Sequence, residues 1–330
     1  MNNFKKVGLT ALAGSLAAIS ANAAELTVTG SATLSYMSLD QENVTTGNSF
    51  GSNSTMAFNA SGDVNGYTVS WMNAISDASG VSSHTLTVDM GDLGSIMFDQ
   101  GAGGNGFASI DDKSPTAWEE SWDQSATAGQ TIAGNQSTNT FKYTNTIMGV
   151  AINAAYDPAT GDAAMGDGAN GAIGVTGSST GFALSNATLI EGLDFGAGMA
   201  KDENNASSTV VKDLESFGAY ANYTFGPATV GYSMTETSGG ISGHGMNQVA
   251  AYGVVFAVNE NLSISWNEHT NTYAKSGGDA NVDQESTGMA IAYTMGSASL
   301  KIQNNETKND GGVTTAKTRD NTEISLGLAF

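Results

Sequence analysis

Cysteine is absent from the 330 residues, and proline occurs only three times. No disulfide can therefore hold the chain together, so its stability must come from backbone hydrogen bonding and packing. Pro115, Pro158 and Pro227 all fall in expected loops or turns, where a residue without an N–H removes no bond from a strand ladder.

Basic residues are also scarce. The sequence holds 11 lysines and arginines against 32 aspartates and glutamates, a formal net charge of −21. This balance argues against binding nucleic acid, because phosphate groups demand lysine and arginine. It favours attraction of cations instead.

Long apolar runs are missing apart from one near the start. The stretch from Val7 to Ser20 is about 14 residues, well short of the roughly 20 that a membrane-spanning helix needs. It follows Lys5 and Lys6 and ends at Ala21-Asn22-Ala23, which is the pattern of a secretory signal peptide. We predict a signal peptide over 1–23 and a mature chain over 24–330, with 9 basic and 32 acidic residues and a net charge of −23.

Motifs for covalent chemistry are lacking. His84, His244 and His269 have no neighbour at metal-ligand spacing. The glycine-rich stretch 101–106 lacks the Gly-Lys-Ser/Thr ending of a phosphate loop, so we interpret it as a flexible entry to a loop. We predict no enzyme and no cofactor.

Two minor alternatives remain open. A hydrolase could be assembled across strands, with His84 beside Ser82 and Ser83 as the nearest hint. Acidic pairs such as Asp111-Asp112 and Asp202-Glu203 could hold loop-bound calcium through oxygen ligands, although no EF-hand spacing occurs.

What the sequence does contain is repeated alternation of apolar and polar side chains, from Glu25 to Phe330. Near the start Leu26, Val28 and Leu34 share one face, while threonines and serines share the other. This two-residue period indicates strands whose two faces meet unlike surroundings. A soluble sandwich would also alternate, so the period alone does not place the chain in a membrane.

The spacing of the strands is more informative. Short Gly- and Asn-containing turns alternate with longer polar segments that we predict as loops, among them 238–246 and 270–285. This alternation is expected where one barrel end faces the periplasm and the other the outside. Counting gives 16 strands, including 67–76, 95–100, 193–202 and 261–269, with 14 or 18 left open. The fold class is therefore all-β: a transmembrane antiparallel barrel of about 16 strands, wide enough to hold water.

The signal peptide, the mature start from Ala24 to Gly30 and the last amphipathic strand ending in Phe330 resemble the Gram-negative general-diffusion porins, particularly the alphaproteobacterial type. The resemblance implies an outer-membrane protein in contact with the lipid bilayer and lipopolysaccharide, usually a homotrimer. It also implies a third external loop that folds inward and narrows a channel for small hydrophilic solutes and ions.

The candidate for that loop is 101–136, the longest connection at 36 residues. We expect Trp118 and Trp122, four residues apart, to anchor it, and their spacing is compatible with a short turn of helix. Lys142 and Lys301 should point into the lumen by alternation, whereas the only arginine, Arg319, falls in the last loop. The predicted pore-constriction residues are Asp111, Asp112, Glu119, Glu120, Asp123, Lys142 and Lys301.

Acids outnumber the bases in this set, so we expect a cation-selective channel. A substrate-specific channel is the nearest alternative, and a file of aromatic side chains along the lumen would favour it; Tyr220 is the one candidate. A structural or adhesive barrel with a plugged lumen is a further alternative. The other interpretation of the loop acids is that they form a solvated face of an external loop and do not line the channel.

Overall fold

The computed structural model describes residues 25–40, 47–77, 80–123, 138–159, 177–203, 210–241, 244–275, 281–315 and 318–330. The predicted signal peptide and residues 124–136 of the long segment lie outside the described residues. No helix in the described ranges is long and apolar enough to cross a membrane.

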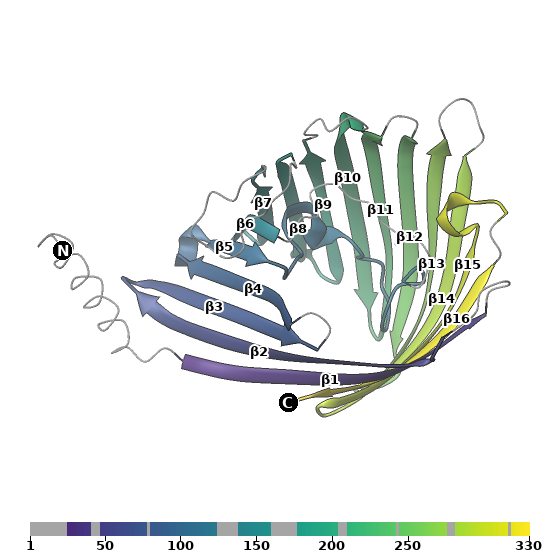
Figure 1. Cartoon of the computed structure of the whole chain (residues 1–330), viewed down its shortest axis with the longest axis horizontal. Coiled ribbons are helices and arrows are strands. Elements are labelled where there is room, and N and C mark those ends of the chain that lie inside the picture. Colours follow the sequence, from purple (N-terminus) through teal and green to yellow (C-terminus); the bar gives the residue numbers. More distant parts are fainter. Residues whose placement is uncertain are drawn as a thin grey trace, which may run out of the picture.

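Sixteen antiparallel strands form one closed barrel, as predicted (Figure 1). They are β1 Glu25–Asp40, β2 Phe50–Val64, β3 Tyr67–Ser76, β4 Gly80–Asp89, β5 Ser95–Gln100, β6 Thr138–Ile147, β7 Val150–Asp157, β8 Ser179–Ile190, β9 Leu193–Asp202, β10 Val210–Phe225, β11 Ala228–Ile241, β12 His244–Ala257, β13 Leu262–Lys275, β14 Val282–Met295, β15 Ala298–Lys308 and β16 Arg319–Ala329. Within the described connections lie the short 3-10 helices η1 Gly91–Leu93, η2 Gly106–Ile110 and η3 Asp310–Gly312.

The barrel closes where the first strand meets the last. β1 pairs with β16 over Ser31–Asp40, and the purple first strand lies beside the yellow last strands in Figure 1. Gly30 and Phe330 exchange two backbone hydrogen bonds of 2.7 and 2.9 Å at the end of this seam. The terminal phenylalanine is thus part of the closure, and closure protects the strand edges from pairing with other chains.

The two faces of the wall differ as the alternation predicts. On β14 the outward Met289, Ile291 and Tyr293 are exposed, whereas the inward Gln284 and Ser286 are buried. An outward apolar surface and an inward polar one is the arrangement of a barrel with lipid outside and water inside.

Strand ends beside the short turns lie within two residues of the prediction, but several ends on the other side of the barrel differ by more. β13 continues to Lys275, six residues past its predicted end at 269, and β11 continues to Ile241. Beyond the apolar belt both faces meet water, so side chains are polar on both and the alternation disappears while the ladder continues. The segments predicted as loops at 238–246 and 270–285 are therefore largely strand.

Candidate functional site

The segment that follows β5 begins with a tight turn around a buried carboxylate. Asp99, on the inward face of β5, accepts hydrogen bonds from the backbone of Ala102 and Gly103 and from the Asn105 side chain, at 2.6–2.9 Å. Gly101, Gly103 and Gly104 have positive φ in this turn. The glycine-rich stretch is therefore a fixed turn and not the flexible entry that we predicted.

The next residues pack against the inner face of β8 to β10. Phe107 is 1% exposed and forms a buried cluster with Ile110 of η2 and with Ala183, Ala200 and Tyr220 of the wall. The Gly106 N–H donates to the Asn153 side chain of β7 at 2.8 Å. In Figure 1 this blue segment runs from β5 across the neighbouring strands. The buried contacts hold it inside the barrel.

The second half of the segment is fastened to β13 and β15 by hydrogen bonds from its own backbone. Ala117 N–H donates to Ser265 Oγ at 2.8 Å, and Ser121 N–H donates to Asn267 Oδ1 at 3.0 Å. The Gln303 side chain accepts from Glu119 N–H at 3.0 Å and donates to the Glu120 carbonyl at 2.9 Å. Side chains of the wall thereby satisfy backbone groups that lie outside the strand ladders.

The two tryptophans of the segment do not lie on a helix. Their spacing is compatible with a short turn of helix, but the described residues form a single turn, closed by a hydrogen bond of 3.2 Å from Asp123 N–H to the Glu120 carbonyl. Trp122 is buried and stacks on His269 of β13 with ring centroids 4.3 Å apart, whereas Trp118 is only partly buried. Anchoring to the wall outweighs the local helical spacing here.

The five predicted acids lie between and beyond these anchors. Asp112 and Asp123 are exposed, and Asp111, Glu119 and Glu120 are half-buried. Carboxylate oxygens of Glu119, Asp123 and the inward Glu323 of β16 lie within 4.8 Å of one another, so one cation could contact all three. The acids thus form one group that includes a residue of the wall.

Crowding and reduced hydration raise the pKa values of four acids in the segment. Burial, followed by the charges of Asp123 and Glu323, raises the pKa of Glu119 to about 8. Burial and the neighbouring Asp112 raise the pKa values of Asp111 and Glu120 to about 7 each. The pKa of Asp112 is raised as well, chiefly because the surrounding barrel limits hydration of its charged form. The charge of the cluster therefore changes around neutral pH.

The lysines of the set both point inward, as alternation predicts, and both contact the segment itself. Lys142 Nζ donates to the Gly104 carbonyl at 2.9 Å, and Lys301 Nζ lies 5.9 Å from the centre of the Trp118 ring. Lys113 lies 6.0 Å from the Tyr220 ring centre. Lys142 and Lys301 thus contact the segment itself, while the charge of Lys113 partly offsets those of Asp111 and Asp112.

The opposite wall of the barrel, β1 to β5, is not covered by the described part of the segment. The side chains that this wall exposes in the middle of its inward face are uncharged. No lysine or arginine occurs between Lys6 and Lys113, which includes all of β1 to β5. The middle of its inward face presents hydroxyl and amide side chains, among them Thr29, Ser31, Asn53, Thr55 and Thr85.

Tyr220 is inward but does not line an open passage. It is 7% exposed, lies beneath Lys113, and its hydroxyl donates to Asp194 at 2.8 Å. Sequence reasoning missed Glu323 as a member of the acid group. The signal was present, because alternation on the last strand places it on the face opposite Ile324 and Leu326.

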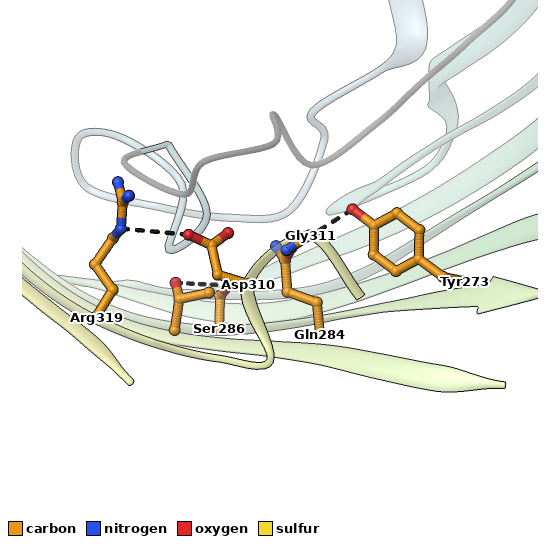
Figure 2. Close-up of polar contacts among 7 residues, drawn as sticks. Tyr273, Gln284, Ser286, Asp310, Gly311 and Arg319 are labelled. Atoms are coloured by element: carbon orange, nitrogen blue, oxygen red, sulfur yellow. Dashed lines mark hydrogen bonds and ion pairs between the residues drawn. The ribbon is translucent and has the colours of Figure 1, made fainter. Parts of the chain in front are cut away.

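The loop after β15 is fastened to the rim above β13, β14 and β16 (Figure 2). Arg319 lies 3.3 Å from the Asp310 carboxylate, which is nearly fully buried, and Gly311 N–H donates to Gln284 at 2.9 Å. Tyr273 also reaches Gln284, at 3.5 Å. Arg319, at the start of β16 and not in the loop, thus has a structural partner at the rim.

Comparison with known proteins agrees with this geometry. A family model described as "Gram-negative porin" matches residues 8–330. No curated protein sequence matches. Among solved structures, an in-vitro folded OmpT of Vibrio cholerae in its trimer form shares 15% identity and a TM-score of 0.62, covering 93% of this chain and 100% of that one.

Two further structures are similar to a comparable extent. Salmonella typhi OmpF in complex with daunomycin shares 12% identity at a TM-score of 0.67, covering 94% of this chain and 99% of that one. An anion-selective porin from Comamonas acidovorans shares 14% identity at a TM-score of 0.62, covering 93% and 100%. At these identities the likeness shows the fold.

Proposed function

Because the chain belongs to the Gram-negative porin family and forms an outer-membrane barrel channel, we propose that small hydrophilic solutes and ions diffuse passively through its lumen and that cations are preferred. The family model covers nearly the whole chain, so the proposal concerns the complete barrel. The alphaproteobacterial type remains a prediction.

One observation carries the cation preference. Asp111, Asp112, Glu119, Glu120 and Asp123 gather on one segment together with Glu323, while β1 to β5 contain no lysine or arginine. Carboxylates at a narrow point raise the local concentration of cations and lower that of anions. We therefore assign these acids, with Lys142 and Lys301, to the constriction.

The fold by itself does not decide the sign of selectivity. One structure with the same architecture is described as an anion-selective porin. Function must be argued from the side chains of the site and not from the barrel. Here the acid cluster favours passage of cations. The two lysines, Lys142 and Lys301, both contact residues of the segment 101–123 that follows β5.

Assembly as a homotrimer is the second part of the proposal. The outward face of β1 to β4 carries small or polar side chains, Ala32, Ser54, Asn73 and His84, flanked by exposed apolar ones. Polar groups facing lipid are costly unless protein covers them. The trimer form of the similar OmpT supports a second and third copy as that cover.

Vesicle swelling tests the diffusion proposal. Purified protein is refolded into phospholipid vesicles, and uptake is followed for neutral sugars of increasing size. A rate that falls smoothly with solute size and does not saturate supports general diffusion. Saturable uptake of one sugar, but not of other sugars of the same size, would favour a substrate-specific channel. No uptake into vesicles that contain the folded barrel would favour a barrel with a plugged lumen.

A further inference from the structure

Six glycines lie on the inward face of β8 to β12 and of β14, directly beneath the inner segment, the described residues 101–123 that follow β5. Gly198 pairs with Gly218 across β9 and β10, and Gly231 pairs with Gly253 across β11 and β12. We call the set the glycine seat: Gly181 of β8, Gly198 of β9, Gly218 of β10, Gly231 of β11, Gly253 of β12 and Gly288 of β14.

Backbone conformation does not explain why these positions are glycine. None of the six has a positive φ, in contrast to the turn glycines such as Gly66 or Gly149. A glycine within a strand weakens it, because it loses more backbone freedom on folding and packs no side chain. Room for another part of the chain is the remaining physical reason.

The first half of the seat is occupied by Phe107. A Cβ atom added at Gly181 would lie 2.8 Å from the Phe107 backbone nitrogen. A Cβ at Gly198 or Gly218 would lie 2.8 or 2.9 Å from the Phe107 ring. These separations are well below the roughly 3.5–4.0 Å of a normal contact between carbon atoms, so a methyl group at Gly181 would displace the segment. At Gly198 the added atom would also meet the Phe182 carbonyl of β8, at 2.6 Å.

The second half is occupied by Pro115 and Ser121. A Cβ added at Gly253 would overlap the Pro115 carbonyl oxygen. One at Gly231 would lie 2.7 Å from Pro115 Cδ, and it would also overlap the Asn222 side chain of β10. At Gly288 the added atom would lie 2.8 Å from Ser121 Cβ and would also meet the Asn305 side chain of β15. The segment between Phe107 and Ser121 carries the acids Asp111, Asp112, Glu119 and Glu120.

We propose that the glycine seat sets the cross-section of the passage, because it fixes how closely the inner segment lies against β8 to β14. Because the described part of the segment lies against β8 to β14, it leaves the side of β1 to β5 uncovered. The seat is thus the size-determining element of the channel, and its residues position the constriction without contacting a solute. This inference rests on the proposed channel function.

Gly181→Ala and Gly253→Ala test it. In each case a backbone atom of the segment stands in the way, so the segment must move by about 1 Å toward the open side. The expected result is a lower single-channel conductance and a smaller size limit in vesicle swelling. Gly51→Ala is the matched control, because Gly51 faces inward on β2 and only the flexible Ser35 hydroxyl lies near, at 3.0 Å.

A double-mutant cycle separates loop displacement from a general weakening of the wall. Gly218→Ala should lower conductance in the wild-type background and have a clearly smaller effect in the Phe107→Ala background, where the ring at 2.9 Å is gone and the Met234 carbonyl of β11, at 3.0 Å, remains. Folded seat variants with wild-type conductance and size limit would overturn the inference, as would an equal loss in Gly51→Ala. A wild-type protein without conductance would instead refute the channel proposal itself.

Discussion

Raising the pH should make the passage more cation-selective, with most of the change around pH 7–8. Burial raises the pKa of Glu119 to about 8 and those of Asp111 and Glu120 to about 7. These groups are neutral when protonated, so each adds a negative charge as the pH rises through its pKa. Between about pH 5.5 and 9 the constriction should gain close to three negative charges.

The size of the effect follows from Coulomb's law. A unit charge about 7 Å from an ion in water contributes roughly 0.6 kcal/mol, and screening over a Debye length of about 10 Å at about 0.1 M salt reduces this to about 0.3 kcal/mol. That energy enriches cations and depletes anions by about 1.7-fold each, a change of about threefold in the permeability ratio per charge. Three charges together should therefore change the ratio by more than about tenfold.

The assay is the reversal potential of the refolded protein in a planar bilayer under a tenfold KCl gradient, where a perfectly selective pore reaches about 59 mV. The reversal potential should move toward the cation limit as the pH rises. The triple variant D111N/E119Q/E120Q should abolish most of this dependence, and Glu285→Gln, on the exposed outward face of β14, should retain it. A flat profile between about pH 5.5 and 9, or a transition near pH 4 alone, would refute the reasoning.

Two further predictions concern stability and assembly. Asp310→Asn should reduce the unfolding free energy of the refolded barrel in urea by about 1.5–3 kcal/mol, because it removes the charged partner of Arg319 at a buried site. Glu306→Ala, which breaks the exposed pair with Lys308, should reduce it by under about 1 kcal/mol. Equal losses in the two variants would contradict this difference. Ser54→Trp should disrupt the trimer on unheated electrophoresis, while Val254→Trp on the lipid face should not; an intact trimer of the folded Ser54→Trp variant would move the interface elsewhere.

The fold was largely predictable because the side-chain period and the turns are local signals. The ranges 67–76, 95–100 and 193–202 were predicted without error, since a glycine lies beside one end of each. The end of β13 was not, because its last residues are polar on both faces. Lys142 and Lys301 could be placed on the inner face by counting, since alternation specifies the face of each side chain.

The site was less predictable because its contacts join residues far apart in sequence. Nothing in the sequence near Phe107 indicates that Gly198 and Gly218 leave room for its ring. The stacking of Trp122 on His269 overrides the helical spacing of the tryptophans, and Asp99 orders a stretch whose glycines suggested flexibility. Such pairings depend on barrel geometry, which alternation does not specify.

Single-channel recording tests the central claim most directly. The chain from Ala24 to Phe330, refolded and verified as a barrel, is added to a planar bilayer under a KCl gradient at neutral pH. The account predicts discrete ohmic steps whose size grows with salt concentration and a reversal potential on the cation side. A folded barrel that gives no ohmic steps would contradict a water-filled passage, and an anion-side reversal potential would contradict the assignment of the loop acids to its constriction.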